Sequence, residues 1–175
     1  MQHETGTFEG LGGVEIFTQS WLPDASPARA AVIIAHGYAE HSGRYGHVAA
    51  YLVERQYAVY ALDHRGHGRS GGARAQVRDF SEFVTDLRTY FDQIRARQPD
   101  LPVFLYGHSM GSLICLLFAL RWQDELTGLI TTGTALRLGG VKAWLEPMVK
   151  LLSQWRPSWS PIPPLQAAGS SRDLT

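Results

Sequence analysis

Four short strand candidates recur along the chain, with room for a helix between them. Three are apolar runs, at residues 30–35, 57–62 and 103–106, and the fourth candidate is residues 126–132. A strand with one face in water alternates apolar and polar residues, so the unbroken runs at 30–35 and 57–62 indicate strands that are buried on both faces. Helical spacing, with apolar residues at three- and four-residue steps, separates the runs at residues 44–56, at 78–98 and again after residue 107. Strands that alternate with helices predict a doubly wound, mostly parallel α/β sheet.

The two ends of the chain have different patterns. Gly10, Gly12 and Gly13 separate two short apolar stretches near the N-terminus, which predicts a β-hairpin at the entrance to the fold. Residues 1–136 contain all of the strand signals and form the predicted core. From residue 137 on, a broad apolar helical stripe and then a proline-rich stretch follow, so residues 137–175 are expected to form a separate region.

Composition argues against several classes of protein. The chain has 175 residues, 45% of them hydrophobic, and its 16 basic residues balance 16 acidic ones. Proteins that bind nucleic acid, or membranes through a polybasic surface, need an excess of positive charge, so we expect no nucleic-acid partner. Cys115 lies among apolar residues and is expected to be a buried, inert thiol. No secretory signal is visible, and we expect a cytoplasmic protein.

The segment with the clearest chemistry is Gly107-His108-Ser109-Met110-Gly111, which follows the third apolar run directly. It fits the Gly-x-Ser-x-Gly nucleophile elbow, a tight strand-to-helix turn that exposes a serine hydroxyl. The glycines are expected because the crowded turn leaves no room for a β-carbon. Ser109 is therefore the predicted nucleophile.

A second segment, residues 36–45, follows the first apolar run. Acyl-transfer chemistry needs two donors for the oxyanion, one just after the nucleophile and one from an earlier strand-to-helix loop. The backbone amides of Met110 and Tyr38 are the predicted pair. The seven histidines show no metal-ligand spacing, and no metal or cofactor is expected.

Residues 36–45, 63–70 and 107–111 together resemble the monoacylglycerol lipase branch of the α/β-hydrolase family, with its serine-aminopeptidase-like hydrolases and lysophospholipases. The resemblance runs from Phe8 to about residue 135, with the three motifs in the family's order and spacing. One departure is Ala39, where mammalian members carry a second glycine. The resemblance implies an α/β-hydrolase fold and hydrolysis of a small lipid-like carboxylic ester through an acyl-enzyme on Ser109.

Residues 137–175 are similar to the start of the family's cap, the insertion that covers the acyl site. We expect Trp144, Leu145 and Met148 of its apolar stripe to bind the acyl chain. A tryptophan-rich lid also favours transient contact with a membrane surface.

The family completes its triad with an acid after a later strand and a histidine after the last strand. Neither position is reached in this chain, and the histidines present are expected to serve other roles. His36 is expected to hold the oxyanion loop by hydrogen bonding, the His108 side chain to point away from that of Ser109, and Asp63 to form a turn.

We therefore expect the chain to be the front part of a hydrolase that a C-terminal segment or a second chain completes. Its sheet is expected to end in an unpaired apolar edge at residues 126–132. Two alternatives stay open. One is an inactive fragment or non-catalytic binding module, because a serine without a base is a poor nucleophile. The other is a peptidase or thioesterase of the same fold, because the elbow does not select the leaving group.

Overall fold

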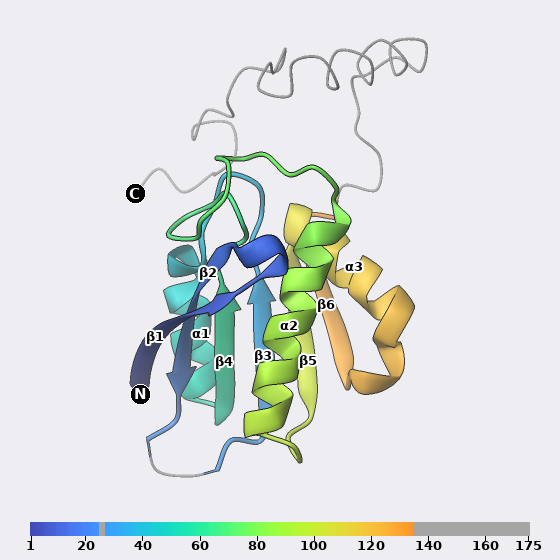
Figure 1. Ribbon diagram of the computed structural model, residues 1–175. Coiled ribbons are helices and arrows are strands. Elements are labelled where there is room, and N and C mark those ends of the chain that lie inside the picture. The colour runs from blue at the N-terminus through green and yellow to red at the C-terminus, as the bar shows by residue number, and fades with distance from the viewer. Residues whose placement is uncertain (25–26, 135–175) are drawn as a thin grey trace. The chain divides into compact units, whose positions relative to one another are not determined.

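The computed structural model describes residues 1–24 and 27–134. In this part of the chain, six strands form one mixed sheet in the order β1-β2-β4-β3-β5-β6 (Figure 1). The strands are β1 (Gln2–Glu9), β2 (Glu15–Leu22), β3 (Ala30–Ala35), β4 (Tyr57–Leu62), β5 (Val103–His108) and β6 (Gly128–Thr132).

The centre of the sheet is parallel. β3 pairs with β4 on one side and with β5 on the other, and β5 pairs with β6. The four strand candidates of the sequence supply these four strands, as predicted. β1 and β2 form the predicted antiparallel hairpin, which joins the sheet through an antiparallel pairing of β2 with β4. The prediction of a mostly parallel sheet with an N-terminal hairpin is confirmed.

Helices cover both faces of this sheet. They are α1 (Gly46–Val53), α2 (Ser81–Arg97) and α3 (Met110–Trp122), with the short 3-10 turns η1 (Leu11–Gly13), η2 (Ser42–Tyr45) and η3 (Gln123–Glu125). Two helices begin later than the spacing predicted. Residues 42–45 form a 3-10 turn before α1, and the carboxylate of Asp79 accepts a hydrogen bond from the Ser81 amide at the start of α2.

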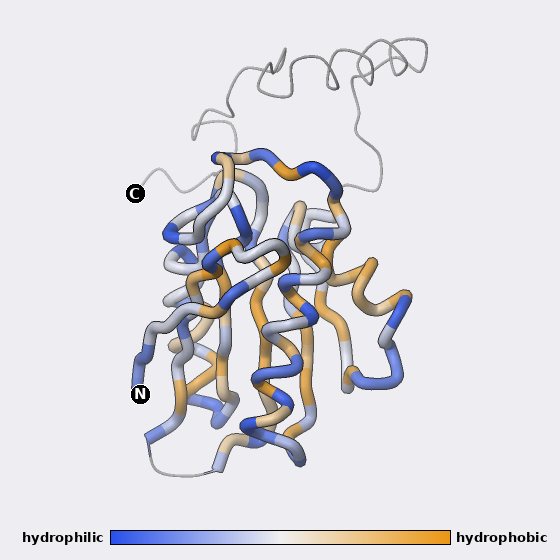
Figure 2. Tube along the Cα trace, in the orientation of Figure 1, coloured by the Kyte–Doolittle hydropathy of each residue, from blue (hydrophilic) through white to orange (hydrophobic). Residues whose placement is uncertain are grey.

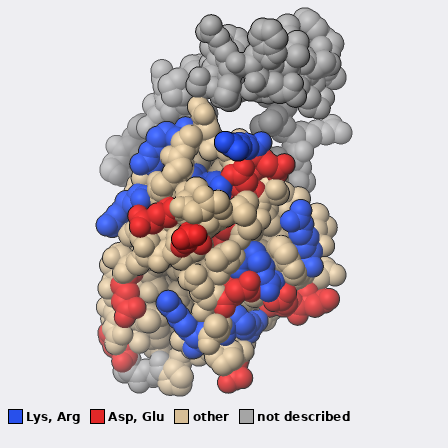
Figure 3. All heavy atoms as spheres, viewed as in Figure 1, with Lys and Arg blue, Asp and Glu red and all other residues tan. Residues whose placement is uncertain are grey.

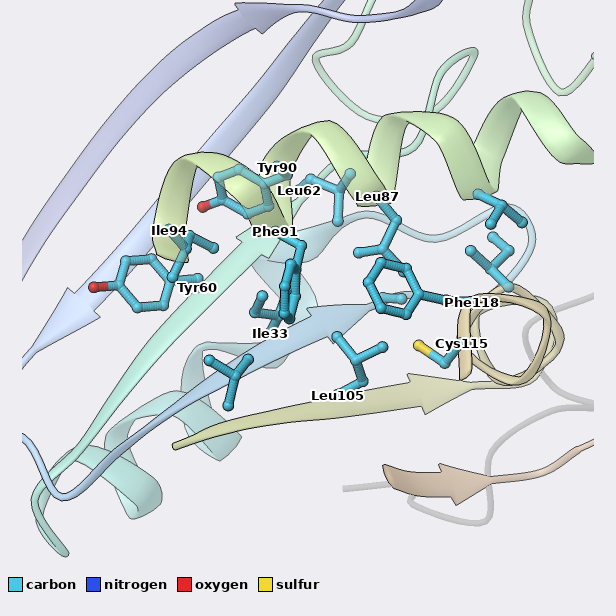
Figure 4. Packing of buried hydrophobic residues seen from close by; sticks show 14 of the residues in the cluster. Ile33, Tyr60, Leu62, Leu87, Tyr90, Phe91, Ile94, Leu105, Cys115 and Phe118 are labelled. Atoms are coloured by element: carbon cyan, nitrogen blue, oxygen red, sulfur yellow. The ribbon is translucent and has the colours of Figure 1, made fainter. Parts of the chain in front are cut away.

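The core lies in two layers, because successive side chains of a strand point to opposite faces. Ile33 packs in the larger cluster with side chains of α2 and α3, while Ile34 packs in the smaller cluster with α1. Both are fully buried. Figure 4 shows Phe91, Leu105 and Phe118 filling the space between the sheet and the two helices. In Figure 2 the central strands are the most hydrophobic part of the trace, as a doubly wound sheet requires.

β6 is the edge strand of the sheet within the described residues. Its Ile130 is 45% exposed, and Leu120 of the neighbouring α3 is 81% exposed. An apolar edge at residues 126–132 was expected from the sequence, and this part of the chain has one. None of the helices in residues 1–24 and 27–134 is long and apolar enough to cross a bilayer.

Candidate active site

Ser109 lies between the end of β5 and the first residue of α3, as the elbow motif predicts. Its backbone has φ 50° and ψ −114°, an unfavourable conformation for a residue with a side chain. Two hydrogen bonds hold it there. The Ser109 amide donates to the Thr132 carbonyl at 2.8 Å, and the Ser112 amide donates to the Ser109 carbonyl at 3.0 Å. The strain is maintained by β6 on one side and by α3 on the other.

The two glycines of the elbow are required by close backbone contacts. A β-carbon on Gly107 would lie 2.6 Å from the Gly111 carbonyl oxygen, and one on Gly111 would lie 2.0 Å from the Ala35 carbonyl oxygen. Neither distance is possible for real atoms, so the sequence-based explanation of these glycines is confirmed. The contact with Ala35 also presses the first turn of α3 against the end of β3.

The loop after β3 lies beside the serine. A β-carbon on Gly37 would be 3.3 Å from the Ser109 β-carbon and 3.2 Å from the His108 ring. Tyr38, the next residue, is 49% exposed. Within the described residues, the amides of Tyr38 and Met110 donate to no other group. Their assignment as the oxyanion donors stays a prediction.

Glu40 fixes the shape of this loop, a role that the sequence did not reveal. Its Oε2 accepts hydrogen bonds from the Gly37 amide at 3.1 Å and from the Tyr45 hydroxyl at 2.9 Å. Burial opposes ionisation of Glu40, but these two bonds and the nearby positive charge of Arg44 together lower the pKa of the carboxyl. Ala39, between the bonded residues, has φ 57°, so the position that departs from the family's glycine is strained.

His36 holds the loop after β3 by hydrogen bonding, as expected. It is fully buried, and its Nε2 accepts a hydrogen bond from the His64 amide at 2.9 Å. The proton of the neutral ring is therefore on Nδ1, which donates to the Gly37 carbonyl at 2.7 Å. Burial lowers the pKa of His36 to about 4, so the ring is neutral at neutral pH and has no free nitrogen for proton transfer.

Asp63 is committed to the loops around the site. Its Oδ1 accepts from the Ser42 amide at 2.7 Å and from the Ser42 hydroxyl at 2.6 Å, and its Oδ2 accepts from the Arg69 amide at 2.8 Å. The carboxylate thus joins the loop after β3 to the glycine-rich turn after β4. This confirms a turn-forming role.

The turn after β4 is also fixed to α2, by a buried ion pair. Arg65 donates from Nε and Nη2 to the two carboxylate oxygens of Asp86, at 2.7 and 2.8 Å. The Asp86 side chain is fully buried and that of Arg65 is 7% exposed. Asp86 also accepts from the Leu11 amide at 2.9 Å, and Arg65 contacts Glu82 as well. One carboxylate therefore links the N-terminal hairpin, the turn and the helix.

The other predicted side chains are placed as follows. His108 bonds the Thr132 hydroxyl through Nδ1 at 3.0 Å, and His67 bonds the Arg65 carbonyl through Nδ1 at 3.0 Å. Cys115 is fully buried, and burial raises the pKa of its thiol to about 12, which confirms the expected inert thiol. The predicted cap residues Trp144, Leu145 and Met148 lie outside the described residues.

The described part of the chain contains no group of three or more histidine, cysteine or acidic side chains that could hold a metal ion. Its chemistry is that of a serine hydroxyl at a helix N-terminus, next to a glycine loop with free amides. Such an arrangement stabilises negative charge on a substrate oxygen.

Comparison with known proteins agrees with this geometry. The sequence profile of the serine aminopeptidase S33 family matches residues 26–175. The chain belongs to this α/β-hydrolase family. Family relatives include the monoacylglycerol lipase of Mycolicibacterium smegmatis, 44% identical over 168 residues, which are 95% of this chain and 59% of the relative. The monoglyceride lipase of Homo sapiens is 41% identical over 118 residues, 67% of this chain and 39% of the relative.

Solved structures of the same fold include a thermostable carboxyl esterase from Bacillus coagulans, with a TM-score of 0.77 and 30% identity over 89% of this chain and 51% of that one. A monoglyceride lipase from Saccharomyces cerevisiae, 24% identical, has a TM-score of 0.74 over 90% of this chain and 53% of that one, a likeness of fold alone. The chain spans about half the length of the relatives it matches.

The family's triad needs a base on the serine. His36, His67 and His108 each hydrogen-bond other groups, and no histidine of residues 1–24 and 27–134 bonds the Ser109 hydroxyl. The described residues therefore hold Ser109 in the elbow geometry without a histidine bonded to its hydroxyl.

Proposed function

We propose that this chain carries the nucleophile of a carboxylic-ester hydrolase that acts on monoacylglycerols or similar monoacyl esters such as lysophospholipids. The observation that carries the proposal is the strained backbone of Ser109 at the N-terminus of α3, beside the Gly37 loop. Relatives named monoacylglycerol lipase support the substrate class.

In the proposed reaction, the Ser109 hydroxyl attacks the ester carbonyl carbon while a base takes its proton. The carbonyl oxygen becomes an oxyanion that accepts hydrogen bonds from the Tyr38 and Met110 amides. Collapse of this intermediate breaks the ester bond, and the alcohol leaves with the proton. Water then hydrolyses the acyl-enzyme by the same route. Trp144, Leu145 and Met148 are proposed to bind the acyl chain.

The base and acid are proposed to come from a segment or second chain outside residues 1–175. A second candidate function, a non-catalytic binding module, is favoured by the absence of a histidine partner for the Ser109 hydroxyl within the described residues. The two candidates differ in the reactivity of Ser109, which a fluorophosphonate probe reports because labelling requires an activated serine.

The test compares two proteins. One is the 175-residue chain, and the other is this chain joined to the part of the Mycolicibacterium smegmatis lipase that lies beyond the matched residues. We expect monooleoylglycerol hydrolysis and probe labelling at Ser109 in the joined protein and neither in the short chain. Ser109→Ala removes both activities, while Ser81→Ala, at the start of α2, changes neither.

Three results would contradict the proposal. A joined protein that folds but takes no label favours the binding module. Retention of a tenth of the rate in Ser109→Ala means that another group is the nucleophile. Turnover at enzyme-like rates by residues 1–175 alone means that one of the histidines in this chain is the base.

A further inference from the structure

The loop between β4 and α2 concentrates positive charge. Residues 66–78 contain Arg69, Arg74 and Arg78, all exposed, and no aspartate or glutamate. The chain as a whole has equal numbers of basic and acidic residues. The charge of this loop is therefore a local excess that the composition hides. We call Arg69, Arg74 and Arg78 the arginine loop.

None of these arginines forms an ion pair with another described residue. The arginines that do are Arg44, Arg55, Arg65 and Arg88. The nearest acidic neighbour in sequence, Asp79, accepts a hydrogen bond from the Ser81 amide at the start of α2. The positive charge of the arginine loop is thus left for a group outside these residues.

The loop is also preorganised. The Gly66 amide donates to the Gly71 carbonyl at 2.7 Å, and the Gly66 carbonyl accepts from the Ala75 amide at 3.0 Å, which folds the loop on itself. Arg74 donates to the Gly68 carbonyl at 3.0 Å, so its guanidinium is held beside the residue that precedes Arg69. Holding like charges together costs free energy unless an anion offsets it.

A second contact orients Arg69. Its guanidinium carbon lies 4.1 Å from the centre of the Phe17 ring, over the ring face. Its backbone amide is bonded to Asp63, which also holds the oxyanion loop. The arginine loop is therefore coupled to the site by one shared carboxylate.

The arginine loop lies at the same end of the sheet as Ser109. It follows β4 and Ser109 follows β5, and both strands run parallel to β3 (Figure 1). Figure 3 shows basic side chains spread over this face of the described residues, some of them at this end. Tyr38, about half exposed, follows β3 at the same end and adds an aromatic ring of the kind that favours membrane interfaces.

We propose that the arginine loop docks the protein on an anionic phospholipid bilayer, with Arg69, Arg74 and Arg78 donating to lipid phosphates, so that the Ser109 end faces the membrane. A guanidinium group can donate two parallel hydrogen bonds to two oxygens of one phosphate, a bidentate contact. The choice of a lipid surface over nucleic acid rests on the proposed function, because monoacyl esters partition into membranes. A nucleic-acid footprint would also need a basic domain, and the net charge here is zero.

The experiment measures sedimentation of the 175-residue chain with vesicles of phosphatidylglycerol and phosphatidylcholine, or of phosphatidylcholine alone, at low and high salt. Each arginine near an anionic surface contributes about fivefold to partitioning, so three contribute about 100-fold at low salt. We expect binding to the anionic vesicles only, weakening as salt rises. The triple variant R69Q/R74Q/R78Q is expected to lose about 100-fold in partition coefficient.

The matched control is R29Q/R55Q/R97Q, which removes the same charge from exposed positions at the opposite end of the strands. We expect it to lose less than fivefold. An unchanged thermal unfolding midpoint shows that each variant is folded, and the salt dependence of the unmodified chain tests the proposal without any variant. Equal losses in both triple variants, or no preference of the unmodified chain for anionic vesicles, would overturn it.

Two further measurements distinguish membrane docking from nucleic-acid binding and from the proposed esterase function. Tighter binding to duplex DNA than to vesicles, lost in the arginine-loop variant, would mean that the partner is nucleic acid and would also overturn the proposal. Ser109→Ala is expected to bind vesicles as the unmodified chain does. If the joined protein binds vesicles but has no esterase activity, the result counts against the proposed function alone. If it hydrolyses a soluble ester but does not bind vesicles, the result counts against membrane docking alone.

Discussion

Adding one methyl group at Gly111 tests whether the contact between α3 and β3 fixes the position of Ser109. A β-carbon there would lie 2.0 Å from the Ala35 oxygen, 2.6 Å from the Ala35 carbonyl carbon and 2.7 Å from the His36 oxygen. All three are backbone atoms at the end of β3, so no side-chain rotation relieves the clash. Gly111→Ala therefore forces α3 and β3 apart by about 1 Å.

The loss of stability follows from the packing between α3 and the sheet that this displacement disrupts. Overpacking a close-packed core costs about 1–3 kcal/mol even when side chains can adjust. Here only backbone can move, and α3 carries Ile114, Cys115 and Phe118, all fully buried in the larger cluster. We expect Gly111→Ala to lower the free energy of unfolding by at least about 3 kcal/mol. The same shift moves the Met110 amide, and in the joined protein a displacement of about 1 Å is expected to cost on the order of 100-fold in the rate of ester hydrolysis.

The matched control is Gly46→Ala, the same substitution at the first residue of α1, where a β-carbon would meet no atom within 4 Å and φ is −55°. Alanine is favoured over glycine in a helix by about 0.5–1 kcal/mol, so this variant is expected to be slightly more stable. Urea unfolding followed by circular dichroism measures both. A Gly111→Ala midpoint within experimental error of the unmodified chain would refute the close-contact explanation of the elbow glycines.

Two more predictions concern buried charge. Asp86→Ala leaves the guanidinium of Arg65 buried without its main partner, and we expect it to lower the free energy of unfolding in urea by about 3–5 kcal/mol. The control Asp92→Ala breaks a more exposed pair on the same helix and is expected to lower it by less than about 1 kcal/mol. Equal losses in the two variants would contradict this account of the pair. Folding lowers the pKa of His36 from 6.5 to about 4. Between these pH values the unfolded chain therefore binds a proton that the folded chain excludes. As a result, the free energy of unfolding is expected to fall by roughly 3 kcal/mol as the pH decreases from 6.5 to 4. A His36→Gln variant is expected to show a shallower slope, and an identical slope would show that other groups cause the loss.

Residue patterns in the sequence predicted those structural features that are determined by residues adjacent in the chain. The runs at 30–35 and 57–62 became β3 and β4 without change of bounds, because strands buried on both faces need an unbroken apolar sequence. The elbow at residues 107–111 could be located for a similar reason. Its glycines, its serine and the strand before it are adjacent in sequence, and the turn leaves few residue types possible at each position.

Contacts between distant segments could not be predicted in this way. Arg65 and Asp86 are separated by 21 residues, and only the packing of α2 against the turn after β4 brings them together. Glu40 and Gly37 are only three residues apart, but nothing in the residue pattern of the loop after β3 indicated that this carboxylate accepts a hydrogen bond from the Gly37 amide. The hydrogen bond of Ser109 to Thr132 depends on β6 and had no sequence signal of its own.

Under the proposed function, the backbone geometry of Ser109 and the activation of its hydroxyl are separable. The φ of 50° at Ser109 is maintained by Thr132 on β6, by Ser112 on α3 and by the contact of Gly111 with β3, all of them within residues 1–134. An unfavourable backbone conformation persists only when its surroundings fix it from several sides. Because the contacts that fix it are already made, a segment that supplies the base has only to bring one imidazole to the Ser109 hydroxyl. Under the proposed function it need not reshape the elbow, which is why joining the further part of a relative is expected to give turnover.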